Sequence, residues 1–336
     1  MAIDLSLIWF AIIIFAILMY IVMDGFDLGV GILFPLVPDA AGRDVMVNSV
    51  APVWDGNETW LVLGGAALFG AFPLAYAVII DALAIPLTLM LIGLIFRGVA
   101  FEFRFKAPAA HRRFWDGAFL GGSLMATFCQ GVVAGAVVNG IAVSDRHYAG
   151  GPFDWLNAFT LFCGFGLVVA YGLLGATWLI AKAEDPLARQ MRRLTRGLLP
   201  VLLLTFLVIS LWTPLAQPAV ARRWFSLPGF WFLLPVPLMV AAFSLLLWRR
   251  ATDSQVNIQP FLLALGLIFL GFAGLGISIW PHLIPPHVTL WQAAAPAASQ
   301  RFMLVGALII IPVILGYTAW SYWVFRGKVP SGEGYH

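Results

Sequence analysis

Long apolar stretches dominate this sequence of 336 residues and constrain its fold more than any other feature. A membrane helix needs roughly 20 mainly apolar residues, because the hydrocarbon core is about 30 Å thick and each helical residue rises about 1.5 Å. The sequence therefore predicts an all-α polytopic membrane protein with about nine transmembrane helices. The nine stretches are Leu7–Met23, Trp54–Ala71, Tyr76–Val99, Gly117–Val143, Phe153–Ala181, Leu198–Leu215, Leu227–Trp248, Pro260–Trp280 and Phe302–Val324.

Composition supports the membrane assignment. Charged residues make up 10% of the chain, against roughly 25% in ordinary soluble domains. The apolar stretches are continuous, whereas transmembrane strands alternate apolar and polar residues over about ten positions, which disfavours a barrel. No basic segment precedes the first stretch and no small-residue cleavage pattern follows it, so we expect it to remain as a helix. The joins are short, and residues 1–336 are expected to form a single integral-membrane domain.

The positive charges predict the orientation of the chain. If nine helices alternate in direction, fifteen Lys and Arg residues lie on one side and four on the other. The positive-inside rule then places the N-terminus in the periplasm and the C-terminus in the cytoplasm. This bias accounts for the net charge of +3, and no basic stripe suggests a nucleic-acid partner. The minority side holds Arg146, Arg222, Arg223 and Arg301.

Ionisable residues inside membrane helices are costly and therefore mark candidate functional sites. The apolar interiors of the fourth to ninth helices contain none, whereas the first three helices contribute, within them or at their ends, Asp24, Asp27, Asp55, Glu58, Asp81 and Arg97, with Glu102 just beyond. A spacing of three places Asp24 and Asp27 on one helix face at the predicted inner end of the first helix. Asp55 and Glu58 open the second helix from the same side. We expect these carboxylates and Arg97 to meet at the cytoplasmic surface, where closely held acids can pass protons.

Each of these residues also has a structural interpretation. Asp55 and Glu58 have the spacing of a helix N-cap and N3 pair, which stabilises a helix start. Asp24 and Asp27 have no such explanation, because the dipole disfavours carboxylates at a helix C-terminus. Asp81 is expected to be an outer-surface group, and Arg97 could simply extend to the interface.

Histidine and methionine argue against a haem or metal bound by this chain alone. All five histidines, His111, His147, His282, His287 and His336, are predicted in loops or the tail, whereas a membrane haem usually takes an axial His from a helix. Met125 and Met239 are more typical of packing. In the fourth stretch, Gly131 and Gly135 favour close helix approach, and Gln130 and Asn139 are expected to make interhelical hydrogen bonds.

Two segments carry a resemblance to a known family. Met23-Asp24-Gly25-Phe26-Asp27-Leu28-Gly29 and Val53-Trp54-Asp55-Gly56-Asn57-Glu58-Thr59-Trp60-Leu61 resemble the signature of subunit II of cytochrome bd-type quinol oxidases. The segment Ile95–Phe103 around Arg97 is also similar. The resemblance covers essentially the whole chain, and the compact length is similar to that of the cyanide-insensitive branch.

The resemblance implies a heterodimer in the bacterial inner membrane. Subunit I would carry haems b558, b595 and d together with the quinol site, and the complex would reduce oxygen to water and generate a proton gradient. Subunit II would bind no haem and would have two four-helix bundles with a peripheral helix. A small single-helix third subunit and a structural quinone or lipid are left open.

The resemblance also implies site residues, all in a cytoplasmic proton path. Asp55 would be the proton-path carboxylate, Trp54 its neighbour near the subunit interface, and Arg97 and Glu102 contributors. Asp24, Asp27 and Glu58 join this path from the clustering argument above. The alternatives are a proton-coupled transporter or channel using the same acids, which usually has polar groups in several spans, and a purely structural assembly subunit.

Overall fold

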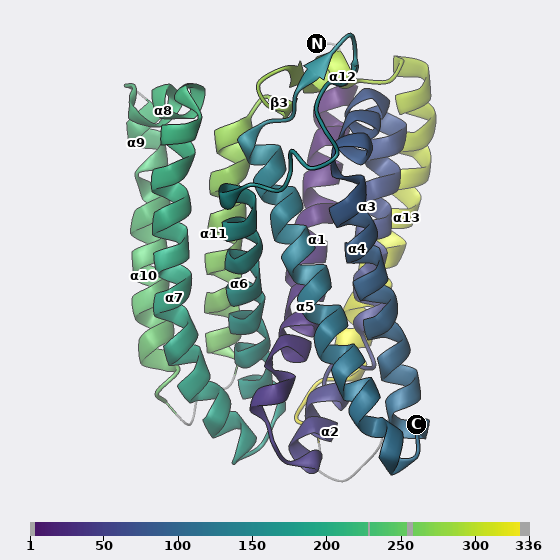
Figure 1. Ribbon diagram of the computed structural model, residues 1–336, viewed down its shortest axis with the longest axis vertical. Coiled ribbons are helices and arrows are strands. Elements are labelled where there is room, and N and C mark those ends of the chain that lie inside the picture. The colour runs from purple at the N-terminus through teal and green to yellow at the C-terminus, as the bar shows by residue number, and fades with distance from the viewer. Residues whose placement is uncertain (1–3, 228, 254–257, 330–336) are drawn as a thin grey trace.

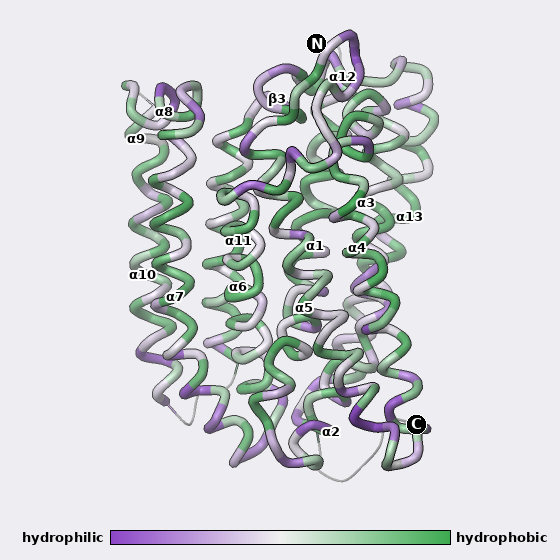
Figure 2. The backbone as a smooth tube through the Cα atoms, in the orientation of Figure 1, coloured by the Kyte–Doolittle hydropathy of each residue, from purple (hydrophilic) through white to green (hydrophobic). Residues whose placement is uncertain are grey.

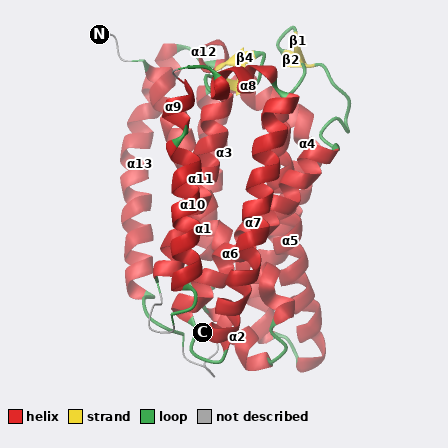
Figure 3. Ribbon diagram, turned by 90° about the vertical axis from the view of Figure 1, so that its left-hand side faces the viewer, coloured by secondary structure: helices red, strands yellow, loops and turns green. Residues whose placement is uncertain are grey.

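The structure is a computed structural model that describes residues 4–227, 229–253 and 258–329. Long helices stand side by side along its longest axis, and short helices, hairpins and loops gather at the two ends (Figures 1 and 3). Apolar residues fill the middle of the helices and hydrophilic residues collect toward the ends (Figure 2). This arrangement is the one expected of helices that cross a bilayer.

The described residues form thirteen α-helices, one 3-10 helix and two small antiparallel hairpins. The first half of the chain contains α1 (Leu5–Leu33), η1 (Phe34–Leu36), α2 (Ala40–Asn48), α3 (Trp54–Ala71), α4 (Pro73–Lys106), α5 (Ala109–Asn139), β1 (Val143–Ser144) and β2 (His147–Tyr148). The second half contains α6 (Ala158–Lys182), α7 (Leu187–Ala216), α8 (Pro218–Phe225), α9 (Gly229–Leu233), α10 (Pro235–Arg250), α11 (Gln259–Ile279), β3 (His282–Ile284), β4 (Val288–Thr289), α12 (Leu290–Ala293) and α13 (Ala297–Val324).

Eight helical segments of the described chain are long and apolar enough to cross a membrane. They correspond to eight of the nine predicted stretches. The ninth stretch forms α3, over the predicted residues Trp54–Ala71. Asp55, Asn57 and Glu58 lower the mean hydropathy of α3, so it is not among the eight helices apolar enough to cross a membrane. The predicted all-α polytopic membrane protein is thus confirmed, with about eight candidate spans.

The prediction that the first helix ends at Met23 is wrong. α1 continues for ten more residues to Leu33. Asp24 and Asp27 therefore lie inside a helix and not at its C-terminus, so the dipole argument made for them does not apply. The residues from Asp24 to Gly31 are all buried, and packing against neighbouring helices sustains a segment whose Gly content weakens helix propensity.

Helix adjacency divides the long helices into two groups of four. α1, α3, α4 and α5 contact one another around one group, and α6, α7, α10 and α11 around the other, with α13 at the edge against α3 and α1. The groups meet where α6 packs on α1 and α5. A Cβ on Gly29 of α1 would collide with the Tyr171 carbonyl oxygen of α6. The two helix backbones are therefore in direct contact.

The predicted close approach at Gly131 and Gly135 of α5 is confirmed. A Cβ on Gly131 would lie 2.6 Å from the Cys163 carbonyl oxygen, and one on Gly135 would lie 2.8 Å from the Cys163 Cβ. Small residues at this spacing let membrane helices pack closely. Here they bring α5 against α6.

α3 runs between the two ends of the bundle. Asn57 in its first turn donates to the Met23 carbonyl of α1 over 3.2 Å. At the other end, Ala71 accepts a backbone hydrogen bond of 2.8 Å from Ala295, next to α12 and the hairpin end of the molecule. α3 thus extends along most of α1, although the mean hydropathy of α3 is lower than that of α1.

Candidate functional site

Arg97 of α4 is the centre of a buried polar site. Its side chain is fully buried, and it donates to Asp24 Oδ1 of α1 over 2.6 Å and to Glu58 Oε1 of α3. Its guanidinium therefore joins three helices. A buried charge is tolerated only when it is paired, and the interpretation of Arg97 as a residue reaching to the interface was wrong.

Asp27 lies one helical turn from Asp24 and is also fully buried. Its Oδ2 accepts a hydrogen bond of 2.7 Å from the Asn57 side chain of α3. Asn57 in turn accepts one of 3.0 Å from the Tyr322 hydroxyl of α13. We call Asp24, Asp27, Asn57, Glu58 and Arg97 the Arg97 cluster.

The Arg97 cluster contains more acid than base. Two carboxyl groups, those of Asp24 and Glu58, bind the single guanidinium, and the carboxyl group of Asp27 lies one helical turn from Asp24. Full ionisation would leave a net charge of −2 in a largely buried region. Burying an excess charge is expensive. Asp24 Oδ2 and Asp27 Oδ1 have no hydrogen-bond partner among the described residues, which leaves acceptor sites for a proton or a water.

Trp54 supports the cluster from the side. Its ring lies 5.9 Å from the Arg97 guanidinium carbon and stacks on Phe101 at 5.1 Å with an interplanar angle of 23°. A guanidinium over an aromatic face is held by a cation–π attraction. Trp54 thus replaces part of the hydration that Arg97 loses on burial.

Two predicted residues lie outside the cluster. Asp55 points to the exposed side of α3, and Glu102 is an exposed residue paired with Lys106 at 3.1 Å. The capping interpretation of Asp55 and Glu58 was also wrong, because α3 has Val53 at its N-cap, without a side-chain hydrogen bond, and Glu58 binds Arg97 instead. Asp55 is close enough to Glu58 to interact electrostatically with it.

A second ionic network, which the sequence analysis missed, lies near α2. Arg104 of α4 donates to Asp44 over 2.6 Å and to Asp116 over 2.7 Å, and Arg43 donates to Asp116 over 3.0 Å. Arg104 is 3% exposed, so its guanidinium depends on these carboxylates much as that of Arg97 depends on its own partners. Arg104 lies seven residues after Arg97, two turns along the same helix face, and this spacing could have indicated from the sequence that Arg104 is buried as well.

A chain of polar side chains extends from the cluster into the bundle. Tyr20 of α1 lies beside Asp24 and accepts a hydrogen bond of 2.6 Å from Gln130 of α5. Gln130 accepts one of 3.2 Å from the Tyr171 hydroxyl of α6. The predicted interhelical hydrogen bonding of Gln130 is confirmed. For Asn139, the bond in the structure is made by its backbone carbonyl, which accepts from Gln217.

Asp81 and the histidines complete the comparison with the sequence predictions. Asp81 is exposed on α4, eight residues after the helix begins. Two residues later, Leu83 has φ and ψ of −120° and 21°, which interrupt the regular helix. His111 lies in the first turn of α5, not in a loop, and His336 is outside the described residues. His147 and His282 are in the hairpins as expected of loop segments.

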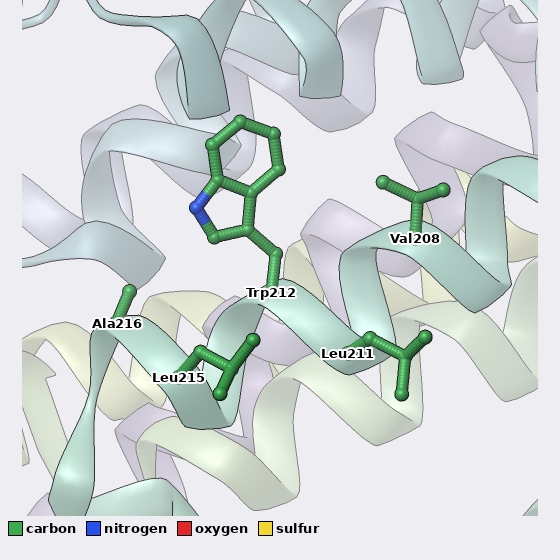
Figure 4. Close-up of a pocket in the computed structure, with 5 residues that line it drawn as sticks. All are labelled: Val208, Leu211, Trp212, Leu215 and Ala216. Carbon is green, nitrogen blue, oxygen red and sulfur yellow. The ribbon is translucent and has the colours of Figure 1, made fainter.

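Two pockets differ in chemistry. One, of about 460 Å³, is an open apolar hollow along α7, and Figure 4 shows Val208, Leu211, Trp212, Leu215 and Ala216 around it. The other, of about 310 Å³, lies near α2 and is lined by residues that include Ser49, Lys182 and Tyr322. Only the second of these two adjoins the Arg97 cluster, through Tyr322.

Comparison with known proteins agrees with this geometry. Residues 5–325 match the family model described as cytochrome bd terminal oxidase subunit II. The cytochrome bd-I ubiquinol oxidase subunit 2 of Escherichia coli strain K12 is 28% identical, over 98% of this chain and 96% of the relative. The cytochrome bd ubiquinol oxidase subunit 2 of Bacillus subtilis is 26% identical, over 97% of each.

A solved structure shares the fold. A chain of the bd oxidase from Geobacillus thermodenitrificans superposes with a TM-score of 0.75 at 17% identity, covering 97% of this chain and all of that chain. The family match spans nearly the entire sequence and includes every residue of the Arg97 cluster. The chain belongs to the cytochrome bd terminal oxidase subunit II family.

Proposed function

We propose that the Arg97 cluster of this oxidase subunit carries protons from the cytoplasm toward a partner subunit that reduces oxygen. The complex would oxidise a quinol, as the names of the relatives indicate for those proteins, and form water. The observation that carries the proposal is the excess of acid over base inside the membrane region. Asp24 and Glu58 bind one guanidinium, and the fully buried Asp27 lies one helical turn from Asp24.

A proton path has a clear energetic purpose in such a complex. Reduction of one O₂ to two H₂O consumes four protons and four electrons. If these protons come from the cytoplasm while the oxidised quinol releases its own protons on the other side, the reaction builds a proton gradient without a pump. Subunit II then needs only conducting acids, which is what the Arg97 cluster offers.

The proposal assigns the haems to the partner. A transmembrane haem commonly takes an axial histidine from a helix, whereas the described histidines lie in the first turn of α5 and in or beside the hairpins. The histidines of the described residues are therefore not placed to ligate a haem within the membrane. We place haems b558, b595 and d, with the quinol site, in subunit I.

We further propose nine membrane spans, with α3 as the ninth, in the bacterial inner membrane. α3 extends from the level of Met23 to the hairpin end of the molecule. With nine spans the Arg-rich end carrying Arg104 and α2 faces the cytoplasm and the N-terminus faces the periplasm. Asp55 and the edge of Trp54 would then face subunit I from the exposed side of α3.

The test is proton uptake by the purified complex in vesicles. Asp27→Asn keeps the size of the side chain but removes a titratable group from the cluster, and we expect oxygen reduction and coupled proton uptake to fall together. Glu184→Gln, an acid outside the spans, is the matched control. Unchanged proton uptake in both Asp27→Asn and Asp24→Asn would contradict the proposal.

A further inference from the structure

The pocket near α2 lies at the cytoplasmic end of the proposed topology. Residues Asn48, Ser49, Pro52 and Val53 form one wall, and Trp178 and Lys182 of α6 form another. Tyr322 and the segment 324–329 after α13 complete the lining. The volume, about 310 Å³, is room for several water molecules at roughly 30 Å³ each.

Tyr322 and Asn57 connect this pocket to Asp27, a fully buried acid. The Tyr322 hydroxyl, on the pocket wall, donates to Asn57 Oδ1 over 3.0 Å, and Asn57 Nδ2 donates to Asp27 Oδ2 over 2.7 Å. Asn57 is 1% exposed and Asp27 is fully buried. The side chains of Tyr322 and Asn57 therefore bridge the distance between the pocket and Asp27.

The C-terminal segment is fixed as a wall of the pocket. Val329 donates a backbone hydrogen bond of 2.8 Å to the Lys182 carbonyl, and Lys182 Nζ donates to the Phe325 carbonyl over 2.6 Å. The Lys182 ammonium also lies 5.0 Å from the Trp178 ring centroid. With its ammonium engaged in these contacts, Lys182 holds the segment against α6, where the segment lines the pocket together with Tyr322.

We propose that protons enter the Arg97 cluster through this pocket, with Tyr322 and Asn57 positioning water beside Asp27. This inference rests on the proposed function. One proton passes from water in the pocket to the water that Tyr322 and Asn57 hold, and from it to an Asp27 carboxylate oxygen; one proton leaves the cluster from Glu58. Asp27, Asp24 and Glu58 lie close enough to interact electrostatically, so a proton gained at one carboxyl favours release at another. Asp55, on the exposed side of α3, then lies after the cluster and not at its entrance.

The first test removes one hydroxyl from the purified complex. We expect Tyr322→Phe to slow oxygen reduction about fivefold and to raise its solvent deuterium isotope effect, with haem content unchanged. A fivefold loss corresponds to about 1 kcal/mol on the barrier. Tyr317→Phe, on the exposed face of the same helix, is the matched control. A structural role for Tyr322 would alter haem content or thermal stability without changing the isotope effect, and that result would overturn the inference.

The second test blocks the pocket itself. Asn48→Cys places a thiol in the lining, and a membrane-impermeant cationic thiosulfonate reagent is applied to the cytoplasmic side of inverted vesicles. We expect labelling to inhibit turnover several-fold, while labelled Lys106→Cys and the wild type keep theirs. Full activity of labelled Asn48→Cys excludes this entrance. If Asp27→Asn is nevertheless inactive, the proton function of the cluster stands and only its entrance is wrong; if Asp27→Asn is also fully active, both proposals fail.

Discussion

Asn57 donates a hydrogen bond of 2.7 Å to Asp27 and thereby ties α3 to α1 at the level of a fully buried carboxyl group. The same amide accepts from Tyr322, so helices from three parts of the sequence meet at one side chain. Asn57→Leu should therefore do more than remove a polar group. It would leave the buried Asp27 without its described hydrogen-bond donor, which costs about 1–3 kcal/mol. Thermal unfolding of the assembled complex measures this loss.

Arg97→Gln should destabilise the complex strongly. It leaves Asp24 and Glu58 without their cation, and breaking a buried ion pair from one side typically costs about 3–5 kcal/mol. Thermal unfolding in mild detergent and the yield of assembled complex measure the effect. Arg113→Gln, an exposed residue of α5, should leave both near wild type. Equal stability of the two variants would show that the ion pairs of Arg97 contribute little to the folded state.

Asp55→Asn should slow oxygen reduction while haem content stays near normal. Asp55 is exposed in this chain but near Glu58, so its loss interrupts transfer without disturbing a packed core. Glu102→Gln is the contrasting variant, because its surface pair with Lys106 is worth at most about 1 kcal/mol. Turnover and haem spectra distinguish them. Normal turnover of Asp55→Asn would remove it from the proton path, and lost haem would indicate a role in assembly.

Gly29→Ala should weaken the contact between the two groups of four helices. The new Cβ would collide with the Tyr171 carbonyl oxygen, and overpacking of this kind costs about 1–3 kcal/mol or more. Gly274→Ala is the matched substitution in α11, where a Cβ would have nothing within 4 Å. We expect a lower melting temperature for the first variant and a small change or a gain for the second.

The N-terminal end of α1 should loosen in acid. Asp4 caps α1 by accepting from Ser6 and Leu7, and a hydrogen bond from Trp291 lowers the pKa of its carboxyl below the usual 3.8. A lowered pKa means that the ionised carboxylate stabilises the folded form above pH 3.8 and that this contribution disappears as the pH falls through the lowered value. The protection of amides at the start of α1 against hydrogen exchange, relative to the intrinsic rate at each pH, should therefore fall below about pH 4. Asp4→Ala should show the faster exchange already at neutral pH.

The sequence predicted the spans well because hydrophobic length is a local property. α3 begins and ends at the predicted residues, and α11 differs by one residue at each end. The end of α1 was missed because the acids and glycines after Met23 look like a helix stop. Packing against α6 and α5 stabilises this part of α1. Such packing depends on the tertiary structure and cannot be read from the local sequence.

The sequence predicted which residues form the candidate site better than it predicted how they are arranged. Asp24, Glu58 and Arg97 were expected together and are together, since buried charges in a membrane need partners. Their depth was not foreseen, and neither was Asn57, because an uncharged amide gives no warning in a sequence. The structure shows that Asp55 and Glu102 are exposed, unlike the residues of the Arg97 cluster. Spacing along the chain could not distinguish exposed from buried acids.

Tyr322 belongs to the helix that the rest of the chain covers least. Only 6% of the apolar window of α13 is buried, yet this helix supplies a hydroxyl that reaches the buried amide beside Asp27. A helix so little covered by its own chain takes its tilt largely from its surroundings, and tilt responds to the match between helix length and bilayer thickness. We therefore expect the site to respond to membrane thickness. A bilayer that changes the tilt of α13 should lengthen the contact between Tyr322 and Asn57, while the ion pairs of Arg97, which α13 does not make, stay intact.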